Sequence, residues 1–411
     1  MAHRGVGLLL NMAAAVCGLA AVAAAQDAPP AAPLTFEAAV ERALHANPAL
    51  DAARRRQLVA VQAVAVARER PNPDVRVEFT RETPTQSYSL AVPVETGGKR
   101  GRRTAVGQAG VDVSDAEVAR AAVDVRSAVR RAYFELAAAD SNLALLQDVL
   151  DLAVRVRDAA TQRFDAGDAP RLEVLQGELA RAEAENHVTA ARGAVTAARA
   201  RLAALLALPV EAISSLATPI DAGIAGAPGR PGTEADAAHV DLTVFDRQLD
   251  EQRARIALAG AMRVPDLTPE ASLTRGAEPE FSTGWRAGLG VTVPLFTRNR
   301  AAVRLEEATL TAIAAERAAA LSRINGDVAA AGAVADALGQ QYLRYQATIV
   351  PQALEIERLA EDSYRLGRTG IAAFLQALQT SRDVRMRMLQ TAADFQSARA
   401  TLERALGAPL P

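Results

Sequence analysis

The residue types that most often carry out chemistry in proteins are few and scattered in this chain of 411 residues. Cysteine occurs once, and His45, His187 and His239 lie far apart in the sequence. The sequence contains no pair of histidines at helical spacing, no phosphate-binding loop and no nucleophile elbow. We therefore predict no catalytic residue, no metal site and no cofactor, and we interpret the chain as a protein that is not an enzyme.

Two clusters of charged residues around glycines are better candidates for a functional role. Glycine favours the left-handed conformation that ends many helices, so each cluster is predicted to form a turn between two helices. Opposite charges on the two turns could form ion pairs that hold the turns together. The clusters consist of Asp165, Gly167 and Asp168, and of Arg365, Gly367 and Arg368.

The two clusters belong to an internal repeat with a period of about 200 residues. The pair Leu175-Gln176, which follows the first turn, recurs as Leu375-Gln376 after the second. We assign residues 26–209 to the first repeat and 241–411 to the second. Residues 210–240 are rich in proline and glycine and are predicted to be a linker.

Each repeat is predicted to contain a helix, two strands and a hairpin of long helices. No proline or likely helix breaker falls between about residues 112 and 165. Apolar residues at alternating steps of four and three run from Val118 to Ala153 within this stretch, which is the pattern of a coiled coil. A helix over residues 98–164 would span roughly 100 Å. Predicted helices at about 48–70 and 169–208, laid end to end, match that length. We therefore expect a helical wall of even height.

Four segments alternate apolar and polar residues as strands do, at about 74–82, 87–94, 269–276 and 284–294. Their lengths suit tilted strands that span a membrane. A sheet in lipid must close on itself, and four strands are too few to enclose a lumen. Three copies with cyclic symmetry would supply twelve strands.

The predicted fold class is therefore mainly α with a small β part. Long helices would form an α-barrel, and four strands per chain would contribute to a shared twelve-stranded trimeric transmembrane β-barrel. An ordinary soluble antiparallel sheet is the alternative interpretation of the strands.

Two further groups of residues lie in or beside the strands. Aromatic residues favour membrane interfaces, although plain barrel packing is an equal alternative. Cations at the start of a long helix oppose its dipole, so anionic lipid headgroups or local acids such as Glu306 and Glu307 are candidates to favour them. The aromatic group is Phe79, Tyr88, Phe281, Trp285 and Phe296, and the strand-to-helix junctions are Pro93, Gly97, Gly98, Lys99, Arg100, Pro294, Arg298 and Arg300.

The first 25 residues have the pattern of a signal peptide: His3 and Arg4, then an apolar run that ends in small residues at Ala25. An uncleaved anchor is the alternative, and Cys17 within the run could be read as a lipidation site. The net charge of −2, with acids and bases well mixed, argues against nucleic-acid binding.

The second long helix differs from the first because it contains Pro351, where the first repeat has Asp151. Proline removes a backbone donor and kinks a helix. We therefore predict a bend at this position.

Several of these motifs together resemble the outer membrane efflux protein family, the TolC-like ducts. They are the segment Leu34–Ala39 running on to Asn47-Pro48, the Val-Pro strand ends at Pro93 and Pro294, and the paired glycine turns, each followed by a Leu-Gln step. The resemblance implies a homotrimeric channel in the outer membrane that extends into the periplasm. Such ducts work with a periplasmic adaptor (membrane fusion) protein and an inner-membrane pump of the resistance-nodulation-division class, and adaptors would dock at the glycine turns.

The run from Val92 to Arg100 is similar to the branch that serves heavy-metal pumps of the cobalt-zinc-cadmium type. If the cargo is a metal ion, we expect the duct to carry it without binding it tightly. The alternative function is a soluble periplasmic coiled-coil adaptor or scaffold. Adaptors also contain long helical hairpins, but the strand-rich domains that usually accompany them are missing here.

Overall fold

The computed structural model describes residues 33–224 and 239–410. The predicted signal peptide, including Cys17, and residues 225–238 of the predicted linker lie outside the described residues.

Both repeats follow the predicted order of helix, two strands and a long helical hairpin. The first repeat consists of α1 (Phe36–Ala46), α2 (Pro48–Ala67), β1 (Asp74–Phe79), β2 (Gln86–Ala91), α3 (Lys99–Asp165), α4 (Arg171–Leu206) and the short 3-10 helix η1 (Val210–Ala212). The second consists of α5 (Val240–Ala261), β3 (Leu267–Ala277), β4 (Phe281–Val291), α6 (Arg300–Arg344), the π-helical turn η2 (Tyr345–Ile349), α7 (Val350–Arg365) and α8 (Ile371–Leu406). The predicted mainly α fold with long helices and a small antiparallel sheet is confirmed.

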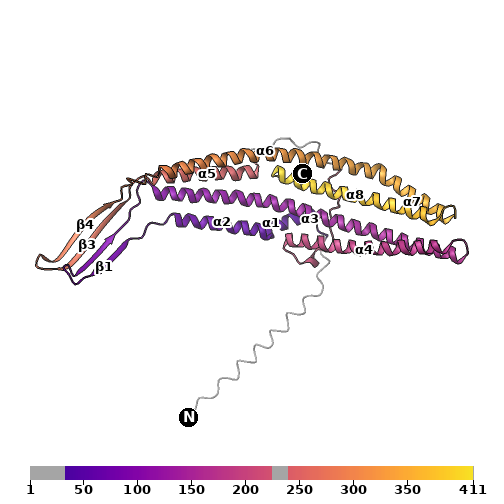
Figure 1. Ribbon diagram of the computed structural model, residues 1–411, viewed down its shortest axis with the longest axis horizontal. Coiled ribbons are helices and arrows are strands. Elements are labelled where there is room, and N and C mark those ends of the chain that lie inside the picture. The colour runs from indigo at the N-terminus through magenta and orange to yellow at the C-terminus, as the bar shows by residue number, and fades with distance from the viewer. Residues whose placement is uncertain (1–32, 225–238, 411) are drawn as a thin grey trace, which may run out of the picture.

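The molecule is elongated, with the sheet at one end and the two hairpin turns at the other (Figure 1). Helices α2 and α4 follow each other along α3, while α5 and α8 follow each other along α6. Helix α3 also packs against α5 and α8, so it joins the two repeats. The predicted stacking of two shorter helices beside one long helix is therefore observed in both repeats.

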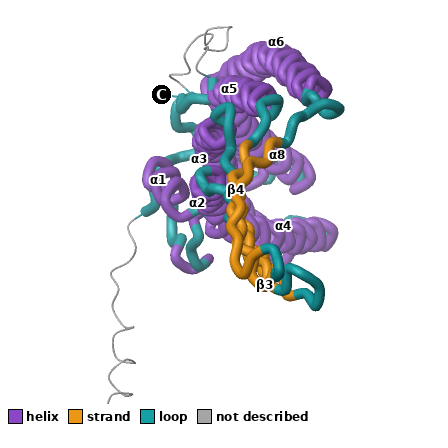
Figure 2. Tube along the Cα trace, turned by 90° about the vertical axis from the view of Figure 1, so that its left-hand side faces the viewer, coloured by secondary structure: helices purple, strands orange, loops and turns teal. Residues whose placement is uncertain are grey.

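The strands form one antiparallel sheet in the order β1-β2-β3-β4. Its register aligns Val77 with Tyr88, Tyr88 with Leu273, and Leu273 with Trp285. Paired residues point to the same face, so the apolar residues of all four strands gather on one side. Figure 2, viewed from the sheet end, shows the strands as a narrow layer in front of the helices, and Figure 1 shows that the sheet projects beyond the helix ends. β1 and β4 are its two edges.

Some element boundaries differ from the predicted ones. β1 ends at Phe79 rather than residue 82, because Thr80 starts the connection and its hydroxyl donates to the carbonyl of Pro84 at 2.7 Å. α2 ends at Ala67 rather than residue 70, since the prolines that follow at 71 and 73 disfavour helix.

The main core lies where α1 meets the middle of α3. Tyr133 is fully buried, and its hydroxyl donates to the carbonyl of Leu34 at 2.7 Å and accepts from the amide of Thr218 at 3.0 Å. Phe36 meets the Tyr133 ring edge-on, with 5.8 Å between ring centroids. Part of the predicted linker packs onto this core, because Ile213, Ile220 and Ile224 are buried in it.

The regular α-helical hydrogen bonding is interrupted next to Pro351, at the position where the sequence predicts a bend. The π-helical turn η2 separates α6 from α7, and Pro351 lies in the first turn of α7. The proline ring clashes with the carbonyl four residues earlier, that of Ala347, and it lacks the donor that an α-helix would need. The added residue of a π turn relieves both conflicts.

Candidate functional site

The sheet exposes an apolar face that nothing in the described chain covers. Trp285 is 83% exposed and Phe79 is 66% exposed, and the ring of Tyr88 packs edge-on against Phe79 with 6.2 Å between centroids. Phe281 begins β4, and Phe296 follows β4 with 99% exposure. A continuous apolar surface of this kind marks contact with lipid or with another chain.

The opposite face of the sheet is polar and has small residues. It presents Ser87 and Ser89 from β2 and Gly288 and Gly290 from β4. The sheet therefore has one face suited to an apolar environment and one suited to water, as the alternation predicted.

Lys99, considered from the sequence as a lipid-facing cation, is instead buried at the start of α3. Its Nζ atom lies 2.7 Å from the Oδ2 atom of Asp266, which precedes β3. The Oδ1 atom of Asp266 accepts a hydrogen bond from the amide of Thr96 at 2.9 Å. This ion pair ties the strand-to-helix junction of the first repeat to the second repeat.

The arginines that follow Lys99 interact with the end of the neighbouring helix. Arg100 donates to the carbonyl of Arg68 at 2.6 Å, and Arg103 donates to the carbonyl of Ala67 at 3.0 Å. Arg103 also forms a two-bond ion pair with Glu95, at 2.5 and 3.1 Å. α2 ends where α3 begins, so these cations oppose the dipole of α3 but favour that of α2 and satisfy its last carbonyls.

The backbone of this junction explains its glycines and proline. Gly97 has a φ of +65°, and an added Cβ would lie 2.8 Å from the Cβ of Val264, so both conformation and space require glycine. Gly98 is left-handed as well, at +70°. The flanking amides of Val92 and Val94 donate to β3 while Pro93, which has no donor, lies between them.

The second junction is built differently. Asn299 takes the left-handed position there with a φ of +47°, and Arg298 donates to the carbonyl of Leu295, one residue after Pro294, at 3.2 Å. Arg298 and Arg300 form no ion pair within residues 33–224 and 239–410. Glu306, considered as a local partner for these arginines, instead accepts from the side-chain amide of Gln252 at 2.5 Å.

The two hairpin turns lie together at the end of the molecule far from the sheet (Figure 1). Gly167 and Gly367 have φ values of +84° and +67°, as the predicted helix-ending turns require. The predicted ion pairs between the turns do not form within the chain, because Arg365 binds Glu361 of its own helix at 2.7 Å. Asp165, Asp168 and Arg368 form no side-chain ion pair in the part of the chain that the structure describes.

A different set of residues joins the two hairpins just inside the turns. Glu173 at the start of α4 accepts from the Tyr364 hydroxyl at 3.2 Å and lies 3.5 Å from the Nη1 atom of Arg163. The Arg163 guanidinium also covers the Tyr364 ring at 4.9 Å from its centroid, and the ring stacks on Phe374 at 5.9 Å. Burial, and then the neighbouring Glu173, raise the pKa of Tyr364.

We define Arg163, Glu173, Tyr364 and Phe374 as the tip cluster, and only part of it was predictable from the sequence. Tyr364 lies three residues before Gly367 and Phe374 directly precedes Leu375, so both lie within the repeated turn motif, which indicates a turn but not a contact between the hairpins. Glu173 has no charged counterpart at residue 373, which is alanine, so the repeat gave no signal for it.

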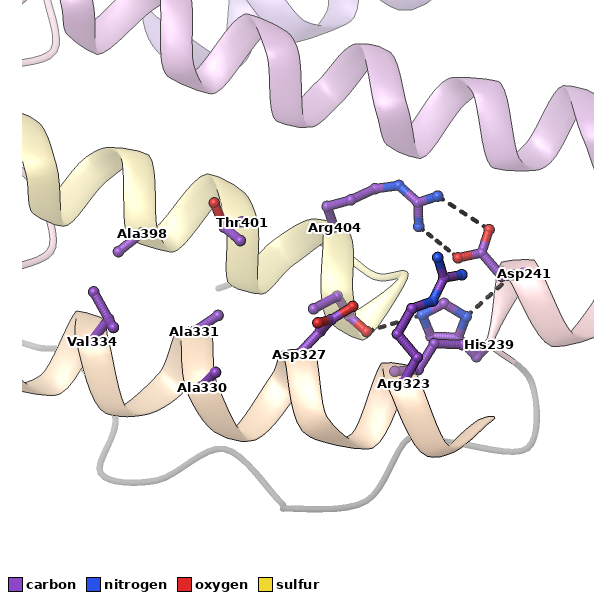
Figure 3. A pocket seen from close by; sticks show the side chains of 12 residues that line it. His239, Asp241, Arg323, Asp327, Ala330, Ala331, Val334, Ala398, Thr401 and Arg404 are labelled. Atoms are coloured by element: carbon purple, nitrogen blue, oxygen red, sulfur yellow. Dashed lines mark hydrogen bonds and ion pairs between the residues drawn. The ribbon is translucent and has the colours of Figure 1, made fainter. Parts of the chain in front are cut away.

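A third set of contacts joins the shorter helices end to end (Figure 3). His239 caps α5 by accepting from the amide of Asp241 through Nδ1 at 3.1 Å, and its Nε2 atom lies 2.9 Å from the carbonyl oxygen of Ala405 in α8. Because Nδ1 accepts, the proton is on Nε2, which donates to Ala405. Asp241 also binds Arg404 through two hydrogen bonds of 2.9 and 3.1 Å. His239 thus has a structural role.

A buried carboxylate connects α8 to α3 near this joint. Glu403 is 1% exposed, and its two oxygens lie 2.7 Å from the Nε atoms of Arg126 and Arg130. Burial by itself would raise the pKa of Glu403, but the hydrogen bonds and charges of Arg130 and Arg126 outweigh it and hold the pKa below the ordinary value. Charge–charge pairing therefore holds α8 of the second repeat against α3 of the first.

The histidines of the described residues, which are far apart in the sequence, also remain apart in the structure. His45 ends α1 and His187 lies on the exposed face of α4, both apart from His239. Over the described ranges, no cluster of three or more His, Cys, Asp or Glu residues is placed to hold a metal ion.

None of the helices described here combines the length and the apolar character needed to cross a lipid bilayer.

Comparison with known proteins identifies the family. The family model described as outer membrane efflux protein matches residues 39–208 and 233–408, one match in each repeat. The chain is 26% identical over 391 residues to the cobalt-zinc-cadmium resistance protein CzcC of Cupriavidus metallidurans, which covers 92% of this chain and 91% of that protein. It is 29% identical over 255 residues to the nickel-cobalt-cadmium resistance protein NccC of Alcaligenes xylosoxydans, covering 57% of this chain and 55% of that protein.

Solved structures share the fold. CusC superimposes with a TM-score of 0.73 at 15% identity, covering 94% of this chain and 96% of that chain. The open state of the Neisseria gonorrhoeae MtrE outer membrane channel gives a TM-score of 0.72 at 19% identity, covering 91% of this chain and 89% of that one.

The family match confirms the predicted non-enzymatic transport role and the outer-membrane location with helices extending into the periplasm. It also sets aside the soluble adaptor that was the alternative function. Channels of this fold form trimers within tripartite efflux systems. The chain therefore belongs to the outer membrane efflux protein family and is an outer-membrane efflux channel.

Proposed function

We propose that three copies of this chain form the outer-membrane duct of a heavy-metal export system, driven by an inner-membrane resistance-nodulation-division pump through a periplasmic adaptor. The observation that carries the assembly is the open sheet, whose four strands leave β1 and β4 with unpaired edges. An edge in lipid would leave backbone donors and acceptors unsatisfied, at a cost of several kcal/mol each.

Pairing between copies removes both edges. In a four-stranded antiparallel sheet the first and last strands run in opposite directions, so β4 of one copy can pair with β1 of the next as an antiparallel ladder. Three copies would close a twelve-stranded barrel with the Trp285 side facing lipid and the Ser89 side facing the lumen. The aromatic residues Phe79, Tyr88, Phe281, Trp285 and Phe296 would then serve as membrane-interface residues.

The opposite end of the duct is the proposed adaptor-docking site. The turns around Gly167 and Gly367 project beyond the tip cluster, and Leu172, Leu175 and Leu366 beside them are exposed apolar side chains. Exposed leucines on rigid helical hairpins offer a surface for a partner helix. The charged residues Asp165, Asp168, Arg365 and Arg368 would flank that surface.

The proposed cargo rests on the relatives. CzcC and NccC are both named for resistance to divalent metals, and the first matches over nearly the whole of both chains. Selectivity among metals is expected to come from the pump, with the duct as a passive conduit.

The assembly and the cargo can be tested separately. Native mass spectrometry of detergent extracts of the outer membrane should give three times the chain mass; a monomer would overturn the assembly. Deleting the gene for this chain in its own host should lower the host's tolerance to cobalt, zinc or cadmium. Expression of the intact chain should restore that tolerance. Unchanged metal tolerance together with new sensitivity to organic drugs would overturn the metal cargo and leave the duct in place.

A further inference from the structure

The polar face of the sheet sorts its charged residues by sign. Directly paired residues of neighbouring strands share a face, so the register divides this face into rows that run across all four strands. The acidic row consists of Asp74, Ala91, Glu270 and Gly288, and the basic row consists of Arg76, Ser89, Ser272 and Arg286. Each of these two rows thus carries two charges of one sign, separated by small residues, and the next row toward the hairpin turns carries the single charge of Glu78.

The two rows have a fixed order along the molecule. Asp74 begins β1 and Ala91 ends β2, so the acidic row lies next to the helices. The basic row lies two residues further toward the hairpin turns of the sheet, at a spacing of about 7 Å. Whatever passes along this face from the helical end meets the acidic row first.

The charges of both rows are open to water. Asp74, Arg76, Glu270 and Arg286 are exposed and border one shallow hollow of the polar face. None of the four forms an ion pair with a residue of the two described ranges, so the alternation in sign is not cancelled by local pairing. Unpaired charges spaced this closely act on ions within about one Debye length, 8 Å at physiological salt.

We propose that these rows form two layers of opposite charge in the exit of the duct, with Asp74 and Glu270 attracting cations and Arg76 and Arg286 attracting small anions. The inference rests on the proposed barrel, in which the polar face lines the lumen. A metal cation entering the exit is drawn to the acidic layer and repelled by the basic layer. It therefore crosses the basic layer together with a small anion such as chloride, and the alternation keeps it from binding tightly.

Cysteine accessibility tests the layers one at a time. The sequence has a single cysteine, Cys17, so a Cys17→Ala background removes every native thiol. In that background Ser89→Cys places a thiol in the basic row, and Ala91→Cys places one in the acidic row, on the same strand and the same face. The rates of modification by an anionic and a cationic methanethiosulfonate are measured on outer-membrane vesicles and divided by the rates of each reagent with a small free thiol.

The two positions should show opposite preferences. One unit charge at about 6 Å in water changes the local concentration of a singly charged reagent by roughly threefold. We expect the anionic reagent to be favoured at Ser89→Cys and the cationic reagent at Ala91→Cys, each by about threefold or more. Adding Arg76→Ser and Arg286→Ser should abolish the preference at position 89. Equal preferences at the two positions, or no change on removing the arginines, would overturn the proposal.

Leu90→Cys separates this inference from the proposed barrel. Leu90 lies between the two positions in sequence but on the apolar face, which the barrel turns to lipid. Protection of this thiol, with reaction at 89 and 91 but no charge preference, contradicts the layers alone. Rapid reaction at 90 with protection at 89 and 91 would contradict the face assignment and the proposed duct with it.

Discussion

Asn47 and His239 occupy the same place in the two repeats and make the same two contacts. Asn47 caps α2 through its side-chain oxygen and donates from Nδ2 to the carbonyl of Leu205 at 2.9 Å. His239 caps α5 and contacts the carbonyl of Ala405 at 2.9 Å. In each repeat one side chain thus caps the start of one helix, α2 or α5, and binds a carbonyl in the last turn of another, α4 or α8, so that the two helices are joined end to end.

The size of the side chain at this joint, Asn47 or His239, determines which residue can follow the end of the adjoining helix, α4 or α8. Gly407 has a φ of +67°, and an added Cβ would lie 3.0 Å from the His239 ring, whereas the first repeat accepts Ala207 at a φ of +50° beside the smaller Asn47. Gly407→Ala should therefore destabilise the protein by more than the about 1–2 kcal/mol of left-handed strain alone. His239→Asn combined with Gly407→Ala should recover part of the loss. Thermal unfolding of purified protein measures both, and a double variant no more stable than Gly407→Ala would contradict the steric explanation.

The tip cluster is expected to keep the two hairpins together. Glu173→Ala removes the acceptor of Tyr364 and the anion beside Arg163, contacts worth about 1.5–3 kcal/mol for charge-assisted hydrogen bonds. We predict a severalfold rise in single-channel conductance in planar bilayers, and a smaller rise for Tyr364→Phe. Arg365→Gln is the matched control, because among the described residues Arg365 forms an ion pair only with Glu361 of its own helix, and it should leave conductance unchanged. A larger rise in conductance for Arg365→Gln than for Glu173→Ala would instead favour the ion pairs between the turns that the sequence suggested.

The sequence was most informative where local patterns repeat. The glycine turns and the alternating strands each follow from nearby residues, so their types were predictable. Pro351 indicated a disturbance of the helix, but not that it takes the form of a π-helical turn. Contacts between the two repeats were not predictable. Lys99 pairs with Asp266, and Glu173 bonds to Tyr364, across more than a hundred residues of sequence. Neither pair has a counterpart at the equivalent positions of the other repeat. A single sequence carries no signal for such pairs, because the side chains become neighbours only after the repeats pack.

The stability of the helical wall is expected to depend on pH through Glu403. Its pKa is lowered in the folded protein, so its contribution to stability is complete above the ordinary value of 4.5 and is lost as the pH falls below it. Glu403→Gln should cost about 3 kcal/mol at neutral pH, because it leaves Arg130 buried without its anion. The variant should also lose less stability than the native chain on going from neutral pH to below pH 4.5. Glu178→Gln, at an exposed carboxylate of α4, serves as control; if both variants have the same pH profile, the assignment fails.

The ion pair of Lys99 and Asp266 should hold the sheet in its orientation on the helices. The Lys99 side chain is 6% exposed, while that of Asp266 is 40% exposed, so removing the acid leaves a buried cation that water reaches only in part. Asp266→Ala should therefore cost about 1–2 kcal/mol, less than the loss for a fully buried pair. Asp51→Ala breaks the exposed pair with Arg55 and should change little. Because the pair joins the first repeat to the start of β3, we expect Asp266→Ala, but not Asp51→Ala, to reduce the yield of assembled protein in the outer membrane. Quantitative immunoblotting of membrane fractions decides the point: equal yields for the two variants would mean that the junction is held by its backbone hydrogen bonds alone.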